Sequence, residues 1–148
     1  MPEKETLERA AEDKAEGKSP STQAGEFVRE EIEHVREGKH GARSAKQAIA
    51  IGLSKARRAG VKLPPPKKGQ ASKETREQAK RDVKKGRKAA TNKTSAKRSR
   101  ATLNALKREG RTAASKTALS RQAHKAAAKR SAASRSRSAK KAAATRKK

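Results

Sequence analysis

The sequence predicts an all-α protein: a small helical unit of two to three helices followed by a long basic tail that is disordered or conditionally helical. Three observations predict this class. Among the 148 residues, 39 % are charged and only 30 % are hydrophobic. Most large apolar residues, and the only aromatic one, Phe27, precede residue 66. The commonest residues beyond that point, Ala, Lys and Arg, are good helix formers. So few large apolar side chains cannot offset the entropy of ordering the whole chain.

The charge is unevenly distributed along the chain. Residues 1–40 hold seven basic and eleven acidic side chains, whereas residues 41–148 hold 35 basic and four acidic ones. A block of like charge this long is typical of an interaction tail, and nucleic acid is the commonest polyanion in a cell. We therefore divide the chain into an acidic N-terminal helix or arm (1–19), a small helical domain (20–66) and a Lys/Arg/Ala-rich basic tail (67–148).

The first two predicted helices differ in how much they can bury. Residues 3–16 are rich in Glu, Lys and Ala, but Leu7 is their only large apolar residue, so we expect a frayed helix. The second helix covers residues 22–37 and ends at Gly38, a residue suited to a C-terminal stop. Its apolar face follows the i, i+4, i+7 spacing and consists of Val28, Ile32 and Val35.

The third helix has the clearest local signals. Ser44 and Gln47 form a capping-box pattern at its start, and the helix continues to about residue 59. Gly60 stands where a left-handed C-cap is expected, and Val61 can close the hydrophobic contact of that cap. Gly52 lies in mid-helix, where glycine costs roughly 1 kcal/mol relative to alanine. A close approach of the second helix would explain this glycine.

Three consecutive prolines, residues 64–66, cannot continue a helix, and we place the domain boundary there. Beyond them, three stretches have the composition of helices: 72–85, 95–109 and 112–133. Like charges at i, i+4 spacing oppose these helices in water. We therefore expect the tail to be mostly disordered when free and to become helical when a polyanion neutralises it.

Residues 43–57 read Arg-Ser-Ala-Lys-Gln-Ala-Ile-Ala-Ile-Gly-Leu-Ser-Lys-Ala-Arg, and Gly-Lys-His-Gly precedes them at 38–41. Over about residues 20–66 this pattern resembles a family of small basic bacterial proteins of unknown function. In that family the shared core is approximately Arg-Lys-Gln-Ala-Ile-Ala-Ile-Ala-Leu-Ser-x-Ala-Arg, so Gly52 stands where Ala is common. The resemblance implies a bacterial source and a helical fold, and it implies no activity.

The tail from residue 84 to residue 148 is similar in composition to the Lys/Ala/Ser-rich tails of linker histones and histone-like bacterial nucleoid proteins. This resemblance implies condensation of DNA through its phosphate backbone.

The charge itself predicts the same partner. After residue 110 there are 13 basic residues and no acidic residue, and Lys and Arg bind phosphate by displacing condensed counterions. The tail has no aromatic side chain on which a base could stack, which favours duplex DNA over single strands. The residues expected to contact phosphate are Lys84, Lys85, Arg87, Lys88, Lys97, Arg98, Arg100, Lys107, Arg108, Arg121, Lys125, Lys129, Arg130, Arg135, Arg137, Lys140, Lys141, Arg146, Lys147 and Lys148.

We therefore expect a non-catalytic, sequence-tolerant, nucleoid-associated DNA-binding protein in the bacterial cytoplasm. Two alternatives stay open: an RNA- or ribosome-associated basic protein, and a protein-interaction module at 20–66 with a polyanion-tethering tail. No apolar run approaches the roughly 18 residues of a membrane span, so we expect no membrane partner. Because the short helices bury little alone, they favour a homo-oligomer through Phe27, Ile32, Ile49 and Leu53.

Two further nucleic-acid contacts involve the start of the third helix. Free N–H groups there could hold one phosphate together with Lys39, Arg43, Ser44 and Lys46. Alternatively, the second and third helices form a helix-turn-helix in which Arg43, Lys46 and Gln47 reach bases. An ordinary capped connection between two core helices explains the same residues, and the connection is longer than that of a helix-turn-helix.

The sequence predicts no catalytic residue, no cofactor and no metal. Glu30 and His34 have i, i+4 spacing, but no second histidine follows at helical spacing, and His40 and His124 lie among basic residues. Exposed carboxylates without a desolvating scaffold do not make a general acid. One further hypothesis is that the acidic residues of the N-terminal arm fold back on the tail when DNA is absent, although a solubilising helix is the simpler interpretation of these residues: Glu3, Glu5, Glu8, Glu12, Asp13 and Glu16.

Overall fold

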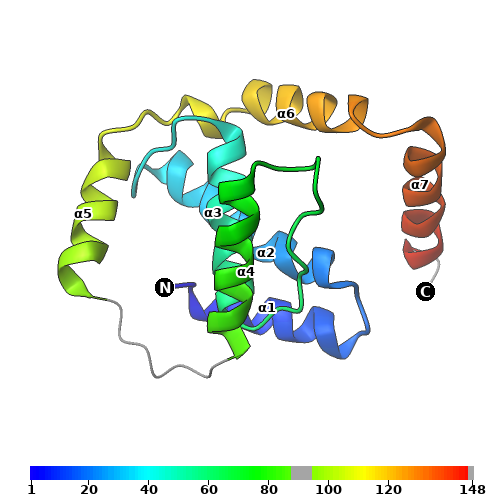
Figure 1. Cartoon of the computed structure of the whole chain (residues 1–148), viewed down its shortest axis with the longest axis horizontal. Coiled ribbons are helices and arrows are strands. Elements are labelled where there is room, and N and C mark those ends of the chain that lie inside the picture. Colours follow the sequence, from blue (N-terminus) through cyan, green and yellow to red (C-terminus); the bar gives the residue numbers. More distant parts are fainter. Residues whose placement is uncertain (88–94, 147–148) are drawn as a thin grey trace.

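The computed structural model describes residues 1–87 and 95–146, and within these ranges the chain forms helices and connections without a named strand (Figure 1). The all-α prediction is therefore confirmed. The elements are α1 (Lys4–Ala15), α2 (Pro20–Glu37), α3 (Ala45–Arg58), α4 (Lys73–Arg87), α5 (Ala96–Lys107), the 3-10 turn η1 (Thr112–Ala114), α6 (Lys116–Ala128) and α7 (Ala132–Arg146). None of these helices combines the length and the apolar character that crossing a membrane requires.

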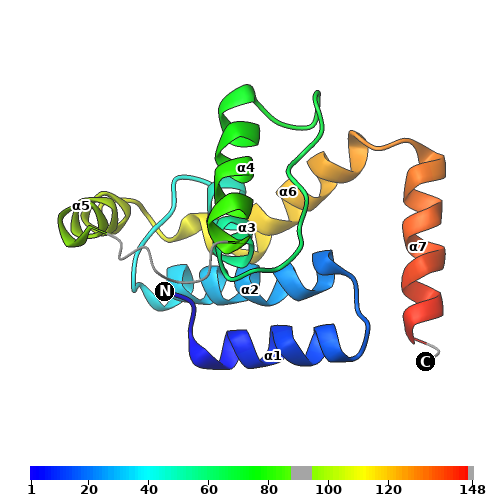
Figure 2. The ribbon, with the colours of Figure 1, turned by 60° about the horizontal axis from the view of Figure 1, so that its bottom comes forward.

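The N-terminal arm is part of the packed structure. Helix α1 lies antiparallel beside α2, as Figure 2 shows. Ala10 of α1 joins a buried cluster with Ala24 and Phe27 of α2 and Ala56 of α3. The frayed helix predicted for 3–16 is instead docked, because a small residue at the right position suffices for a close contact between two helices. Leu7, the residue on which that prediction depended, is 42 % exposed.

The caps predicted from the sequence are present. The Ser44 side chain accepts a hydrogen bond from the Gln47 backbone N–H at 3.2 Å, and the Gln47 side chain accepts one from the Arg43 N–H at 2.7 Å. Gly38 ends α2 with φ +79°. Beyond α3, Gly60 has φ +94°, and the Val61 N–H donates to the Ala56 carbonyl at 3.1 Å. These bonds satisfy polar groups that a helix leaves unpaired at its ends.

Helices α2 and α3 cross in direct backbone contact at Gly52. A Cβ at this position would lie 2.6 Å from the Val28 Cα and 2.9 Å from the Phe27 carbonyl oxygen. The close approach predicted for Gly52 is therefore confirmed. Only glycine allows the two backbones this separation.

Helix α4 packs on α3, so the packed unit continues beyond the predicted boundary at residue 66. Asp82 of α4 is 1 % exposed and accepts hydrogen bonds from Ser54 at 2.6 Å and Arg58 at 2.7 Å, both on α3. Gln78 donates to the same carboxylate at 3.0 Å. This buried polar contact, rather than large apolar residues, holds the first part of the expected tail against the helical unit.

A second part of the expected tail lies in the core. Ala113 and Ala114 of η1 are buried in a cluster with Val35, Ala42 and Ala48, and the Ala114 carbonyl accepts a hydrogen bond from the Arg36 side chain at 3.0 Å. We expected no residue after 66 to join a core, because the large apolar residues there are few. Two alanines do so by filling a narrow space.

The rest of the tail is also helical. Helices α5 and α7 bury no side chain. The predicted stretches 72–85, 95–109 and 112–133 coincide broadly with α4, α5 and η1–α6, whereas α7 was not predicted. The tail that we expected to be disordered is thus described as helical over most of its length. Its Ala, Lys and Arg residues have the propensity for this conformation.

The apolar residues expected at an oligomer interface belong to the monomer. Phe27 is 1 % exposed, and Ile32 and Leu53 pack against the buried clusters of the same chain. Ile49 is partly buried. Phe27 is therefore not available to a second copy, whereas Ile32, Ile49 and Leu53 are partly exposed, and the homo-oligomer stays a prediction.

Candidate nucleic-acid interface

The basic residues predicted to contact phosphate are exposed wherever the structure describes them. Seventeen of the twenty fall within the described ranges, on α4 to α7 or the connections between them, and each has an exposed side chain. The other three, Lys88, Lys147 and Lys148, lie outside the described residues. Solvent exposure is the first requirement for contact with a DNA backbone.

These basic residues have few acidic neighbours. Residues 95–148 hold 18 Lys and Arg and a single acid, Glu109. Glu109 approaches Arg43, with 3.6 Å between Oε1 and Nε. Across the part of the chain that the structure describes, no Lys or Arg of α5, α6 or α7 forms an ion pair with a carboxylate. Anions from outside the molecule must therefore balance this charge.

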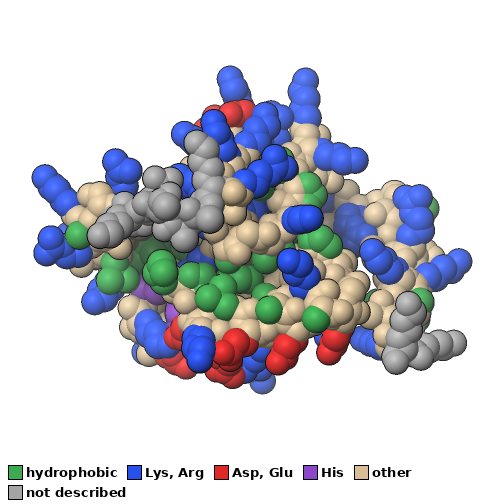
Figure 3. Space-filling model, turned by 90° about the horizontal axis from the view of Figure 1, so that it is seen from below, with side chains coloured by type: hydrophobic (Ala, Val, Ile, Leu, Met, Phe, Trp, Pro, Cys, Tyr) green, Lys and Arg blue, Asp and Glu red, His purple; other side chains and the backbone are tan. Residues whose placement is uncertain are grey.

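Eleven of the fifteen acidic side chains belong to residues 1–40. Figure 3 shows most of the visible acidic side chains along the lower edge of the molecule, with others at the top and with Lys and Arg over much of the rest. Several of them pair within residues 1–40, for example Asp13 with Lys18 at 2.8 Å and Glu3 with Lys39 at 3.0 Å. The predicted contact between the acidic arm and the basic tail is absent from the described structure. Hydrogen bonds from His34 and then Lys39 lower the pKa of Glu3 to about 2.

The predicted anion site at the start of α3 does not assemble from its four residues. Lys39 contacts Glu3 and Glu37 at 3.0 Å and 3.1 Å, and Arg43 faces Glu109. Ser44 caps its own helix, and Lys46 is exposed. The charges of Lys39 and Arg43 and the backbone amide of Gln47 are thus directed to partners within the chain, and Lys46 faces solvent.

Helix α3 also differs from a DNA-reading helix. It lies between α2 and α4 and buries residues on both sides, among them Ala48, Gly52 and Arg57. Burial of the Arg57 guanidinium lowers its pKa, and the nearby Asp82 carboxylate opposes that shift only in part. These contacts favour the core-helix interpretation of residues 45–58 over the helix-turn-helix.

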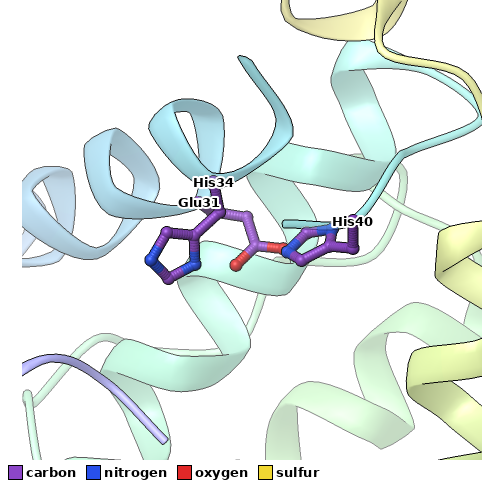
Figure 4. A group of neighbouring side chains, drawn as sticks. All are labelled: Glu31, His34 and His40. Atoms are coloured by element: carbon purple, nitrogen blue, oxygen red, sulfur yellow. The ribbon is translucent and has the colours of Figure 1, made fainter. Parts of the chain in front are cut away.

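A buried polar cluster was missed by the sequence prediction. The Glu31 carboxylate is fully buried between the rings of His34 and His40 (Figure 4), and the Lys55 Nζ lies 2.7 Å from Glu31 Oε2. Lys55 also contacts Glu30 Oε1 at 2.9 Å. Burial lowers the pKa of the Lys55 ammonium, but the carboxylates of Glu31 and Glu30 outweigh it and raise the pKa. His40 lies in the loop after α2, so no helical spacing in the sequence could place it beside Glu31.

Together the fold and the exposed charge define a small all-α protein with a strongly basic surface over α4 to α7. Residues 13–68 match the model of a family of unknown function, DUF6496. This segment begins late in α1, includes α2 and α3, and ends before α4. It agrees with the resemblance of residues 20–66 to an uncharacterised small domain family. No curated protein and no solved structure matches the chain at a significant level.

Proposed function

We propose that this protein is a non-catalytic, sequence-tolerant DNA-binding protein, histone-like and associated with the bacterial nucleoid. One observation carries the proposal: the described Lys and Arg residues of α5 to α7 are exposed and have no carboxylate partner. Duplex DNA carries about one negative charge per 1.7 Å of its axis, and cationic side chains release its condensed counterions. The bacterial location rests on the family resemblance of residues 20–66.

Helix α7 illustrates why the binding is sequence-tolerant. Its 15 residues span about 22 Å and include Arg135, Arg137, Lys140, Lys141 and Arg146. At about 100° per residue these positions surround the helix instead of forming one face. A helix that is basic on all sides can contact phosphates, but it presents no fixed row of side chains to base edges.

The packed part of the protein then serves as an anchor. Helix α4 is held by the buried Asp82 carboxylate, and η1 is held by the burial of Ala113 and Ala114. These two attachments hold α4 and the start of α6 against the packed unit. Phosphate neutralisation is therefore assigned to the exposed side chains of α4 to α7, and the helical unit holds them together.

The test is the affinity of the full chain for duplex DNA as a function of salt, measured by fluorescence anisotropy. Two duplexes of unrelated sequence and one structured RNA are compared. We expect equal affinities for the two duplexes and a linear log–log plot. With about 6–10 phosphate contacts, affinity should fall by roughly 10³–10⁵ between about 50 and 200 mM salt. A flat plot, or a strong preference for one duplex, would contradict the proposal. Clearly tighter binding of the RNA would favour the RNA-associated alternative.

A further inference from the structure

The cluster formed by Glu31, His34 and His40 brings three metal-binding groups to one place. One ligand atom from each residue lies within 4.8 Å of the other two. The Glu31 side chain is 0 % exposed, and those of His34 and His40 are 12 % and 9 % exposed. Figure 4 shows both rings turned toward the carboxylate, one from α2 and the other from the loop after it.

The outer hydrogen bonds of both histidines leave one ring nitrogen of each available. An ionised carboxylate and a carbonyl oxygen only accept hydrogen bonds. His34 Nε2 is therefore the donor to Glu3 at 2.8 Å, and His40 Nδ1 is the donor to the Gly41 carbonyl at 3.0 Å. The nitrogens left to bind an ion are His34 Nδ1 and His40 Nε2. Metal-binding histidines almost always have such an outer hydrogen bond, which fixes the tautomer and the direction of the ring.

The buried Glu31 carboxylate has Lys55 and His40 close by but receives no well-aligned hydrogen bond. Neither of its oxygens receives a hydrogen bond of good geometry, although Lys55 Nζ is 2.7 Å from Oε2 and His40 Nε2 is 3.2 Å from Oε1. Burial of a charge is costly unless the charge is paired and hydrogen-bonded. Lys55 is also shared with Glu30.

The charges around the cluster do not balance while both histidines are neutral. Two buried carboxylates, Glu30 and Glu31, share a single ammonium group, that of Lys55. One negative charge is left over at a site from which water is largely excluded. A cation at Glu31 Oε1 would compensate it, and Lys55 would keep Oε2.

From this juxtaposition we propose that Glu31, His34 and His40 bind a divalent transition-metal ion, with zinc the best chemical match. Two imidazoles and one carboxylate form a known three-ligand set for zinc, which leaves a fourth position for water. Metal–ligand bonds of about 2.0–2.2 Å place tetrahedral ligands roughly 3.3–3.5 Å apart. The 3.2 Å between His40 Nε2 and Glu31 Oε1 is close to this range.

The ion would connect α2 to the loop that follows it. That loop is also hydrogen-bonded to the end of α5, through Gly41 N–H to Leu106 O at 2.9 Å, and to the connection after α5, through Ala42 N–H to Gly110 O at 3.0 Å. A metal that holds His40 against α2 would therefore stabilise the junction between the helical unit and the basic helices. The site stabilises the fold and is independent of the DNA-binding proposal.

The experiment uses the full chain without nucleic acid. Zn²⁺ binding is measured by calorimetry, and Co²⁺ binding is measured by its visible d–d absorption. We expect one ion per chain, a four-coordinate type of Co²⁺ spectrum and a higher melting temperature with Zn²⁺. His34→Gln and His40→Gln should each lose the spectrum and weaken affinity by at least about tenfold, as loss of one ligand implies. His124→Gln is the matched control, because His124 is exposed on α6 and should leave both readouts unchanged.

A second readout needs no variant that alters the cluster. The chain contains three histidines, so its imidazole proton NMR spectrum is simple. Co²⁺ should shift or broaden the His34 and His40 resonances and spare that of His124. Failure of the folded protein to retain Zn²⁺ or Co²⁺ would overturn the proposal and leave Glu31 and His40 as a buried ion pair. Equal effects of Co²⁺ on all three histidines, or unchanged binding in His40→Gln, would overturn it as well.

Discussion

Replacement of Gly52 by alanine tests the crossing of α2 and α3 that organises the packed unit. In an open mid-helix position this change would stabilise the helix by about 1 kcal/mol. Here the added Cβ would lie 2.6 Å from the Val28 Cα, whereas carbon atoms in contact prefer about 3.5–4.0 Å. Both contacting groups are backbone, so no side-chain rotation can relieve the overlap, and the two helices must separate by about 1 Å.

Separation of the helices loosens the cluster around Phe27, which is 1 % exposed. Overpacking of this kind costs typically about 1–3 kcal/mol, and the upper end applies because backbone atoms collide. After the gain in helix propensity, we expect Gly52→Ala to lower the free energy of unfolding by about 2 kcal/mol. For a chain of this size that corresponds to a melting temperature lower by about 4–8 °C.

Gly25 provides the matched control. It lies in α2, and a Cβ there would meet no atom within 4 Å. Gly25→Ala should therefore raise the melting temperature by about 2–4 °C, in proportion to a gain of about 1 kcal/mol. Thermal unfolding followed by far-UV circular dichroism measures both variants. If Gly52→Ala were as stable as Gly25→Ala, the close contact between α2 and α3 would be refuted.

Two further predictions concern single polar contacts. Ser44→Ala removes the N-cap of α3 and should cost about 1 kcal/mol in urea unfolding, whereas Ser95→Ala, at an N-cap without a side-chain hydrogen bond, should change stability little. Equal losses would show that the cap contributes nothing. Asp82→Ala removes a buried acceptor from Arg58 and should cost about 1–3 kcal/mol, while Glu77→Ala, which breaks an exposed pair, should stay within about 0.5 kcal/mol. A neutral Asp82→Ala would contradict the docking of α4.

The elements that local chemistry specifies could be predicted from the sequence. The start of α3 follows from Ser44 and Gln47, and its end follows from Gly60 in the left-handed conformation. Gly52 also predicted a contact between two helices, because glycine destabilises the middle of a helix and a close approach of a second helix explains its presence there. In each case the information lies within a few residues of the feature that it determines.

Contacts made by small or polar residues could not be predicted in this way. Ala113 and Ala114 are chemically like the many exposed alanines of the tail, and only the shape of the space beside Val35 makes them core residues. Aspartate is a residue type that usually lies at the surface, yet Asp82 is 1 % exposed. The unit therefore extends past residue 66 without any change in sequence character that would mark the extension.

Some candidate functional residues could be predicted from the sequence, and others could not. Exposure of the basic residues on α4 to α7 followed from composition, because charged side chains seldom bury. The cluster of Glu31, His34 and His40 depends on how the loop after α2 folds back, and sequence spacing does not encode that path. The DNA-binding proposal thus rests on the basic charge of the tail, which can be read from the sequence. The metal proposal rests on the positions of Glu31, His34 and His40 in the folded chain.

The salt dependence of DNA binding in two charge-matched variants tests the central claim most directly. Arg135→Gln, Arg137→Gln and Lys140→Gln together remove three charges from α7, and Lys4→Gln, Lys14→Gln and Arg29→Gln remove three exposed charges from α1 and α2. If the basic helices neutralise phosphates, the first variant should lower the magnitude of the log–log salt slope by about 2.7, at roughly 0.9 per phosphate contact. The second variant should keep the wild-type slope. Equal slopes in the two variants would contradict the claim, since DNA would then respond only to the net charge of the protein.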